Sequence, residues 1–397
     1  MNTELEISKN NFQKILDEIN TALTKEEKLN LINSLINKIK KNNYPLFEND
    51  STVILLYQGD IEKIEVIGDM TNWEYGIPMK KIKDTNLFYL RGRYEPNARL
   101  EYWLRLSEND FPFTDPLNSY KSLNGLGELS ELVMPGYEPH PYFDDYKFGK
   151  KGGYESLREF KLFSEVLNYD HTIHIYIPPG YDSQKKYSSV YFQDGRDYIE
   201  FAVVPHVLNE LIKSQIIEPL IAVFVTPPNL HQPAVPNRMT EYGLNDNYVK
   251  FFVDELVPFV DSNFSTKKNY TQRLVAGESY GGLISTYISF SHPEIFGMAY
   301  SQSGYHSFQK DKMIYLLEIN EQKPVKLYVD IGTYERKVGS SFISLDETDF
   351  LAANRRLRKA LLQKNYNFIY KEYFEGHTWG NWRRHLIDAL IYFFKKK

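Results

Sequence analysis

One short stretch in the second half of the chain restricts the possible folds more than any other. Gly277, Ser279 and Gly281 form a G-x-S-x-G pattern. It follows the apolar residues 274–276, which are typical of a strand end, and precedes residues 283–290, which are typical of a helix. A strand that turns this sharply into a helix strains its serine and leaves no room for side chains beside it. The pattern therefore predicts a serine exposed at a strand end, a position suited to a nucleophile.

Strands and helices alternate from residue 159 to the C-terminus. Residues 161–166 and 172–177 are predicted to pair as a hairpin. Residues 220–225 are continuously apolar, which is what a parallel strand buried on both faces requires. Helix-compatible segments separate the other predicted strands, which are residues 188–193, 274–276, 297–302, 325–331 and 368–374. This alternation predicts an α/β domain with a doubly wound, mostly parallel sheet and helices on both faces.

A serine nucleophile in such a fold is followed along the chain by an acid and then by a histidine. After Ser279 the chain contains His292, His306, His377 and His385. His377 has a loop-like setting directly after a predicted strand. His292 lies in a turn after a helix, His385 lies in a helical stretch, and His306 comes too soon after the serine. We therefore expect His377 to be the general base.

The acid is expected in or after the predicted strand 325–331. Glu335, which lies in the loop that leaves this strand, is our choice. Asp330 is the main alternative because it lies closer to the strand, and Asp346 and Asp349 stay open if the loop is long.

Length, composition and charge exclude several classes of protein. With 397 residues the chain has room for two or three domains. Its net charge of −5 indicates no footprint for nucleic acid. It contains no cysteine, which excludes thiolate metal sites and cysteine nucleophiles. No apolar stretch approaches the roughly 20 residues of a membrane span, and no apolar secretion core follows the polar N-terminus. We expect a cytoplasmic protein that uses no metal or organic cofactor.

The N-terminal part has a different organisation. Residues 9–43 show the periodicity of two amphipathic helices, the second opened by a capping box of Thr24 and Glu27. These helices either dock on this chain or form a homodimer contact. Short strands with polar turns follow and predict a β-sandwich. The predicted domains are a helical hairpin (1–45), the sandwich (46–138), a linker (139–158) and the α/β domain (159–397).

Three motifs of the predicted sandwich resemble early-set immunoglobulin-like modules related to glycogen-binding domains. They are Gly68-Asp69-Met70-Thr71-Asn72-Trp73, Pro78-Met79 and Leu100-Glu101-Tyr102. Such modules precede the catalytic domain in enterochelin esterases and in some carbohydrate esterases. Trp73 is either a core anchor or a glycan contact.

The C-terminal part resembles the α/β-hydrolase esterases of the esterase D and enterochelin esterase group. The resemblance rests on Tyr176-Ile177-Pro178-Pro179-Gly180-Tyr181-Asp182, Phe192-Gln193-Asp194-Gly195-Arg196, Arg238-Met239-Thr240-Glu241-Tyr242, Asp254-Glu255-Leu256-Val257-Pro258, Gly277-Glu278-Ser279-Tyr280-Gly281-Gly282 and Phe374-Glu375-Gly376-His377-Thr378-Trp379. It implies Ser279 as nucleophile, His377 as base and Glu335 at the acid position. The sequence departs from the group at His171, where relatives often have Arg, and at Thr378, where Asp is common.

The expected oxyanion hole consists of two backbone N–H groups, those of Tyr280 and Arg196. Arg238 either contacts catecholate or carboxylate oxygens of a substrate or pairs with Glu241 three residues later. Trp379 and Trp382 either stack on an acyl group or a sugar or pack in the core.

The leading functional hypothesis is a serine carboxylesterase that cleaves siderophore-like or other small esters. The alternatives are a carbohydrate esterase that removes acetyl or feruloyl groups and a catalytically silent binding protein on the same fold. A homodimer through the N-terminal helices or the β-module is the partner we expect besides the ester substrate.

Overall fold

The structure is a computed structural model that describes residues 12–41, 44–125, 127–141, 152–228, 238–339 and 347–396. Its internal contacts divide the chain into two units. The N-terminal unit comprises Met1–Glu138 together with a short segment from far along the chain, Phe374–Thr378. The C-terminal unit comprises Pro139–Tyr373 and Trp379–Lys397. Part of the predicted linker, residues 142–151, lies outside the described residues.

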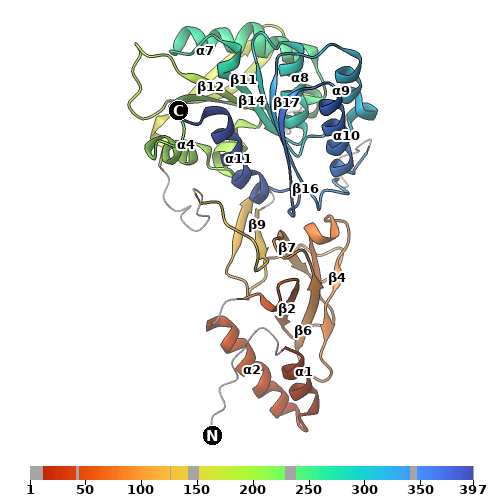
Figure 1. The fold of residues 1–397 in the computed structure, drawn as a ribbon. Helices are drawn as coiled ribbons and strands as arrows, with labels where there is room; N and C mark the ends of the chain where they lie inside the picture. The colour runs from red at the N-terminus through yellow and green to blue at the C-terminus, as the bar shows by residue number, and fades with distance from the viewer. Residues whose placement is uncertain are drawn as a thin grey trace. The chain divides into compact units, whose positions relative to one another are not determined.

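The N-terminal unit begins with two helices and continues as short strands (Figure 1). Its elements are α1 (Phe12–Thr21), α2 (Lys25–Lys41), β1 (Leu46–Asn49), β2 (Thr52–Gln58), β3 (Glu65–Gly68), η1 (Asp69–Thr71), β4 (Ile77–Pro78), β5 (Lys80–Lys81), β6 (Leu87–Arg93), β7 (Arg99–Arg105), β8 (Lys121–Asn124) and β9 (Gly127–Val133).

The predicted capping box is present at the start of α2. The Glu27 N–H donates to Thr24 Oγ1, and the Thr24 N–H donates to Glu27 Oε2, both at 3.1 Å. Two backbone donors of the helix end are thereby satisfied. Phe12 of α1 packs edge-to-face on Tyr89 of β6, with ring centroids 5.6 Å apart. The helices therefore contact a sheet of their own unit, and the homodimer stays a prediction.

Two antiparallel sheets make up the strands of this unit. Among the described residues their orders are β1-β2-β6-β5 and β4-β3-β7-β9-β8. A buried hydrogen-bond network joins them. The Leu56 N–H of β2 donates to the Tyr44 hydroxyl (2.6 Å), and both Tyr44 and Tyr102 of β7 donate to Asp115 Oδ2 (3.1 and 2.7 Å). Such a network is stable in the core because each polar group has a partner.

The C-terminal unit is an α/β domain. Its elements are η3 (Tyr154–Ser156), β10 (Leu157–Ser164), β11 (Tyr169–Tyr176), β12 (Ser188–Phe192), α3 (Gly195–Glu200), α4 (Val204–Lys213), β13 (Leu220–Thr226), α5 (Arg238–Tyr242), α6 (Asp246–Lys250), η4 (Phe251–Leu256), α7 (Val257–Asn263), η5 (Tyr270–Gln272), β14 (Arg273–Glu278), α8 (Tyr280–Ser291), β15 (Met298–Gln302), α9 (Phe308–Ile319), β16 (Lys326–Gly332), α10 (Phe350–Gln363), β17 (Asn367–Tyr373) and α11 (Trp379–Phe394).

Within the described part of this unit the sheet has eight strands in the order β10-β11-β13-β12-β14-β15-β16-β17. The first three pair antiparallel and the rest pair parallel. The predicted hairpin is therefore confirmed, as are the predicted strands and the mostly parallel sheet. The parallel strands β12, β14, β15 and β16 all end at one edge, and in α/β sheets that edge is where ligands bind.

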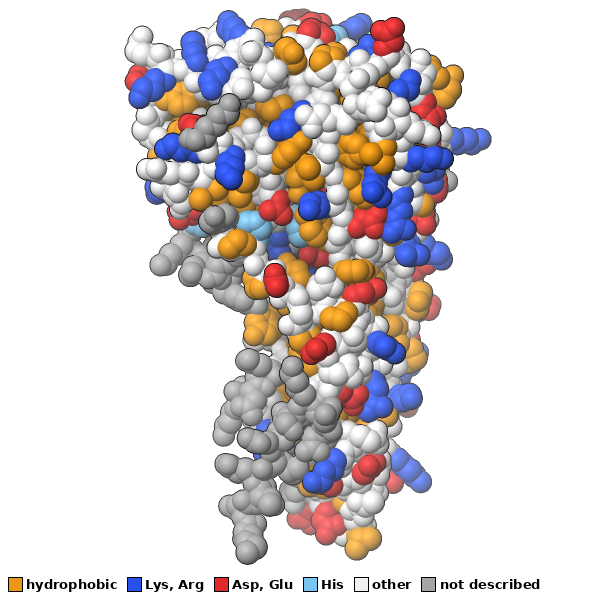
Figure 2. Space-filling view, viewed as in Figure 1, with side chains coloured by type: hydrophobic (Ala, Val, Ile, Leu, Met, Phe, Trp, Pro, Cys, Tyr) orange, Lys and Arg blue, Asp and Glu red, His pale blue; other side chains and the backbone are white. Residues whose placement is uncertain are grey.

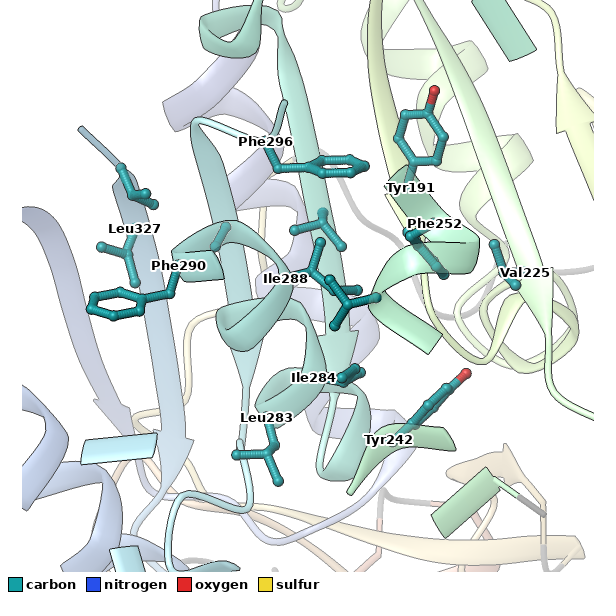
Figure 3. Close-up of a cluster of buried hydrophobic side chains, with 14 of the residues drawn as sticks. Tyr191, Val225, Tyr242, Phe252, Leu283, Ile284, Ile288, Phe290, Phe296 and Leu327 are labelled. Carbon is teal, nitrogen blue, oxygen red and sulfur yellow. The ribbon is translucent and has the colours of Figure 1, made fainter. Parts of the chain in front are cut away.

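Helices cover both faces of this sheet and bury two apolar clusters against it. One cluster includes side chains from α7, α8, α9 and α10, and the other includes side chains from α4 and α11. Figure 3 shows Leu283, Ile284 and Ile288 of α8 within the first cluster. Each is fully buried, and full burial of such a side chain contributes about 1.5–3 kcal/mol. This packing fixes α8 and so places the residue at its N-terminus.

The surface shown in Figure 2 carries Lys and Arg side chains next to Asp and Glu side chains. No field of a single sign covers the face in view, in keeping with the small net charge of −5. Among the residues that the structure describes, none of the helices combines the length and the apolar character needed to cross a membrane.

Candidate active site

Ser279 lies at the turn from β14 to α8, where the sequence predicts it, but it is buried (9% exposed) and not exposed as expected. Its backbone has φ 56° and ψ −119°, a conformation that non-glycine residues rarely adopt. Such a conformation costs about 1–3 kcal/mol and persists only where the surroundings enforce it. Here the Ser279 N–H donates to the Gln302 carbonyl (2.9 Å), and the Ser279 carbonyl accepts from the Tyr305 N–H (3.0 Å). The end of β15 and the loop that follows it thus hold the strained residue at the edge of the sheet.

The small residues around Ser279 are sterically required. A Cβ atom on Gly277 would lie 2.5 Å from the Gly281 carbonyl carbon, and one on Gly282 would lie 2.8 Å from Ser301 Oγ. Contacts this short would force the turn apart, so the predicted need for glycine is confirmed at Gly277. Tyr280 is the first residue of α8, where the helix dipole favours a developing negative charge near its N–H group.

A second turn, residues 194–196, follows β12 at the same edge. Asp194 has left-handed backbone angles (φ 49°, ψ 44°), and its N–H donates to the Tyr242 hydroxyl (2.9 Å). A Cβ on Gly195 would lie 2.6 Å from the Val225 nitrogen, so the turn packs directly on β13. The Arg196 side chain is exposed and pairs with Glu200 (2.8 Å). The expected role of the Arg196 backbone N–H in an oxyanion hole stays a prediction.

Arg238 joins this turn to the strand end before Ser279. Its Nε and Nη2 donate to the two carboxylate oxygens of Asp194 (2.6 and 2.8 Å), and Nη2 also donates to Glu278 Oε1 (2.8 Å). This fork geometry is specific to the planar guanidinium. Its role as a substrate contact stays a prediction, but its geometry gives it the structural role of holding the two turns together.

The alternative pairing of Arg238 with Glu241 is wrong. Glu241 is fully buried and instead accepts hydrogen bonds from the Tyr169 hydroxyl (2.6 Å) and the His171 Nε2 position (2.7 Å). The reason is direction: Glu241 faces β11, whereas Arg238 faces the turn after β12. His171, where the sequence departs from the resembled group, thus has Glu241 as its partner inside the domain.

The carboxyl groups of Asp194, Asp197 and Glu278 crowd this region. Burial raises the pKa of Glu278 well above its ordinary value, against the opposing charge of Arg238. Burial, together with the charge of Asp194, raises the pKa of Asp197 to about 6. Arg238 is therefore the cation that makes this concentration of acids tolerable beside Ser279.

Glu335 is buried in the loop after β16, with its carboxylate held on one side by two donors. Its Oε1 accepts from Ser303 Oγ (2.6 Å) and from the Gly332 N–H (2.7 Å). Ser303 in turn accepts a hydrogen bond from Trp382 Nε1 (2.9 Å). Ser303 directly follows Gln302, the residue that accepts the Ser279 N–H, so neighbouring strand ends hold Glu335 and Ser279. Ser303 was not identified from the sequence, since nothing near it suggests a catalytic role.

The other acid candidates have different surroundings. Asp330 is buried within β16, where its Oδ2 accepts from the Tyr300 hydroxyl (2.6 Å). Asp349 caps α10 by accepting the Ala352 N–H (2.8 Å). Asp346 lies outside the described residues. Among the acid candidates that the structure describes, Glu335 lies in a loop at the carboxyl edge of the sheet. Asp330 lies inside a strand, and Asp349 caps a helix.

His377 lies in the loop between β17 and α11, as predicted, and is half-buried. This loop is the segment Phe374–Thr378 that groups with the N-terminal unit. The other histidines have the surroundings expected from the sequence: His292 caps the end of α8, and His385 lies within α11. His306 is fully buried against Ser301 (Nε2 to Oγ, 3.0 Å), and burial lowers its pKa to about 3, which does not suit a general base near neutral pH.

Trp379 and Trp382 pack in the first turn of α11. Their rings meet edge-to-face with centroids 5.1 Å apart, and Trp379 also packs on Tyr198 at 5.1 Å. Both side chains are buried in the cluster beneath α11. Both tryptophans therefore pack in the core, which was one of the two expected roles. A contact of either with substrate stays a prediction.

This edge of the sheet can therefore support nucleophilic attack by a serine, with backbone donors beside it and a fixed carboxylate nearby. Within the described ranges, no three His, Asp or Glu side chains are grouped as a metal ion would require.

Comparison with known proteins identifies relatives of this unit. A family model described as "Putative esterase" matches residues 164–393. The uncharacterized protein YjcH of Bacillus subtilis is 27% identical over 238 residues, which cover 59% of this chain and 96% of that protein. The endo-1,4-beta-xylanase/feruloyl esterase of Xylanibacter ruminicola is 27% identical over 220 residues, 49% of this chain and 27% of that protein.

Among solved structures, the enterobactin esterase FES from Shigella flexneri, crystallised in the presence of enterobactin, has the same fold. The superposition has a TM-score of 0.72 at 20% sequence identity and covers 89% of this chain and 96% of that chain. The α/β-hydrolase fold expected for the C-terminal unit is thereby confirmed.

Proposed function

The chain belongs to the esterase family whose model matches residues 164–393, and it is a carboxylic ester hydrolase. From this premise we propose that it is a serine esterase whose catalytic triad consists of Ser279, His377 and Glu335. The observation that carries the proposal is the strained Ser279 backbone at the carboxyl edge of the sheet. Glu335, fixed by Ser303 and Gly332 at the same edge, supports the choice of acid.

The proposed reaction proceeds through an acyl-enzyme. Ser279 Oγ attacks the ester carbonyl carbon while His377 takes the serine proton, and Glu335 orients the imidazole and stabilises its cation. The N–H groups of Tyr280 and Arg196 donate to the oxyanion, and losing one such donor typically costs about 10² to 10³ in turnover. The alcohol leaves with the proton from His377. Water then attacks the acyl-enzyme and gives a proton to His377, which passes it to Ser279 Oγ as the serine–acyl bond breaks and the acid is released.

For the substrate we propose a small siderophore-like ester. The superposition on the enterobactin esterase structure covers 89% of this chain, so it must include most of the N-terminal unit as well as the catalytic one. The feruloyl esterase relative matches only 49% of this chain. A shared N-terminal unit argues for a shared type of substrate, and Arg238 remains the proposed contact for catecholate or carboxylate oxygens.

A carbohydrate esterase is the second candidate, because the relative from Xylanibacter ruminicola bears the name of a feruloyl esterase. The third hypothesis, a catalytically silent binding protein, is not favoured, because the chain belongs to an esterase family. Hydrolysis of a tricatecholate triester and of methyl ferulate by the same preparation distinguishes the two remaining substrates. A higher kcat/KM for the ferulate would reject the siderophore proposal.

For the rest of the chain we propose an immunoglobulin-like early-set sandwich for residues 46–138, preceded by a helical hairpin. The two antiparallel sheets joined by Tyr44, Tyr102 and Asp115 support it. We also propose a cytoplasmic location, and a homodimer through this unit as an assembly that size-exclusion chromatography with light scattering would detect.

The test of the triad is hydrolysis of p-nitrophenyl acetate and butyrate by wild type, Ser279→Ala and His377→Ala. Loss of activity in both variants is expected, together with loss of fluorophosphonate labelling in Ser279→Ala. If Ser279→Ala hydrolyses the esters as fast as wild type, the proposed nucleophile is wrong.

A further inference from the structure

The loop that carries His377 is part of the N-terminal unit, where its backbone and one side chain have contacts with β7. The Arg99 N–H of β7 donates to the Phe374 carbonyl (3.1 Å). The Arg99 guanidinium also lies 3.9 Å from Glu375 through its Nη1 atom. Both contacts act on residues just before His377, although β17 and α11 on either side of the loop belong to the C-terminal unit.

Arg99 is the centre of a buried ionic cluster. Its side chain is fully buried, and its Nη2 donates to Glu101 Oε1 (2.7 Å) and to Glu131 Oε1. Glu101 and Glu131 stand directly opposite each other on β7 and β9, where like charges would repel without a cation between them. A buried arginine is costly unless its donors are paired, so this group is held in one geometry. The fixed Arg99 therefore also restrains the Phe374 carbonyl, through its backbone N–H, and the Glu375 carboxylate, through its guanidinium.

A second contact lies at Gly376, the residue adjacent to His377. A Cβ atom on Gly376 would overlap the carboxyl group of Asp69. Asp69 is itself fixed, since it accepts from Trp73 Nε1 (2.9 Å) and from the Glu101 N–H (2.7 Å). Burial, with the charge of Glu101, raises the pKa of Asp69 to about 8, so this carboxyl adds no full negative charge beside the loop at neutral pH.

We propose that Arg99, with Asp69 and Glu375, is a positioning device that holds the histidine loop in its working geometry. The inference rests on the proposed function, in which His377 is the base. The physical reason is that a general base must stay within hydrogen-bond reach of the serine, and a misplacement of about 1 Å can cost on the order of 10²-fold in rate.

The experiment compares two loop variants with a matched control in full-length protein. Glu375→Gln removes the carboxylate that faces Arg99, and Gly376→Ala introduces the Cβ that meets Asp69. Asp115→Asn is the control, because it perturbs an equally buried acid of the same unit that bonds Tyr44 and Tyr102 and has no contact with the loop among the described hydrogen bonds. For each variant, kcat, KM and the melting temperature are measured with p-nitrophenyl butyrate.

We expect kcat to fall about 10- to 100-fold in both loop variants, with KM nearly unchanged. Asp115→Asn should lower the melting temperature but keep kcat. A purely structural role would instead lower the folded fraction in all three variants and leave kcat per folded molecule unchanged. Wild-type kcat per folded molecule in both Glu375→Gln and Gly376→Ala overturns the positioning role.

The same measurement separates this inference from the proposed function. If Ser279→Ala is inactive while both loop variants keep wild-type kcat, the esterase mechanism stands and the positioning role fails. If Ser279→Ala keeps full activity, the proposed mechanism fails, and with it the premise of the positioning role.

Discussion

Replacing Arg238 with methionine is the most informative single perturbation of the candidate active site. The side chain is 23% exposed, whereas its partners Asp194 and Glu278 are 2% and 6% exposed. Removing one partner from a buried ion pair costs about 3–5 kcal/mol, because a charge is left behind without compensation. Here the cation is partly screened by water, so we expect a loss near the low end, about 3 kcal/mol of unfolding free energy.

The loss should depend on pH with a definite sign. Burial already raises the folded-state pKa of Glu278 while the charge of Arg238 lowers it, so without the guanidinium this pKa rises further above its unfolded value. The folded variant then binds more protons than the unfolded one, so its stability falls as pH rises through this range. The difference in stability between wild type and Arg238→Met should therefore shrink at acid pH. Urea unfolding of wild type and Arg238→Met at pH 5 and at pH 8 measures this difference in unfolding free energy at each pH.

Arg355→Met is the matched control, because Arg355 makes a similar bidentate pair with Glu372 (2.8 and 2.7 Å) but is 51% exposed. Exposed pairs contribute about 0–1 kcal/mol, so this variant should unfold close to wild type. Arg238→Met should also lower kcat for p-nitrophenyl butyrate about 10²-fold by loosening the turn beside Ser279. Equal urea midpoints for Arg238→Met and Arg355→Met would refute the argument from buried charge.

The remaining predictions concern three further side chains. Glu335→Gln keeps the shape of the acid but removes its charge, so kcat should fall by at least about 10²-fold at little cost in stability, and unchanged kcat would move the acid elsewhere. Trp382→Phe removes the donor to Ser303, and we expect a loss of about 1 kcal/mol of unfolding free energy, measured by urea unfolding, with a smaller fall in kcat than for Glu335→Gln. Asp197 has a folded pKa of about 6 against an ordinary 3.8, so its contribution to stability is complete below the lower value and is lost as pH rises through the higher one. Asp197→Asn should flatten the pH dependence of the melting temperature in that window, and an unchanged slope between pH 4 and 6 would contradict the shift.

Features with a local cause were predictable from the sequence. The turn at Ser279 was predicted because close packing around a strained residue admits only glycine at Gly277. The capping box at Thr24 was predicted because both of its hydrogen bonds form within one helical turn. The loop setting of His377 followed from the end of one periodic pattern and the start of the next.

Contacts between residues far apart in the chain were not predictable in this way. Arg238 pairs with Asp194 and Glu278, 44 and 40 residues away, where the neighbouring Glu241 was the obvious local partner. The fixed position of Glu335 depends on Ser303, which follows a different strand. These pairings depend on which strands lie next to each other, and no short-range pattern encodes that order.

The sequence by itself thus determined the class of the C-terminal domain, the serine at its strand end and the family of esterases to which the chain belongs. Only the tertiary structure decided which side chains support that serine, and that the histidine loop groups with the N-terminal unit through Arg99 and Gly376. The physical reason is that periodicity and turn chemistry act over a few residues. A buried arginine can pair with carboxylates from distant segments only after the strands that carry them have paired and water has been excluded from the site.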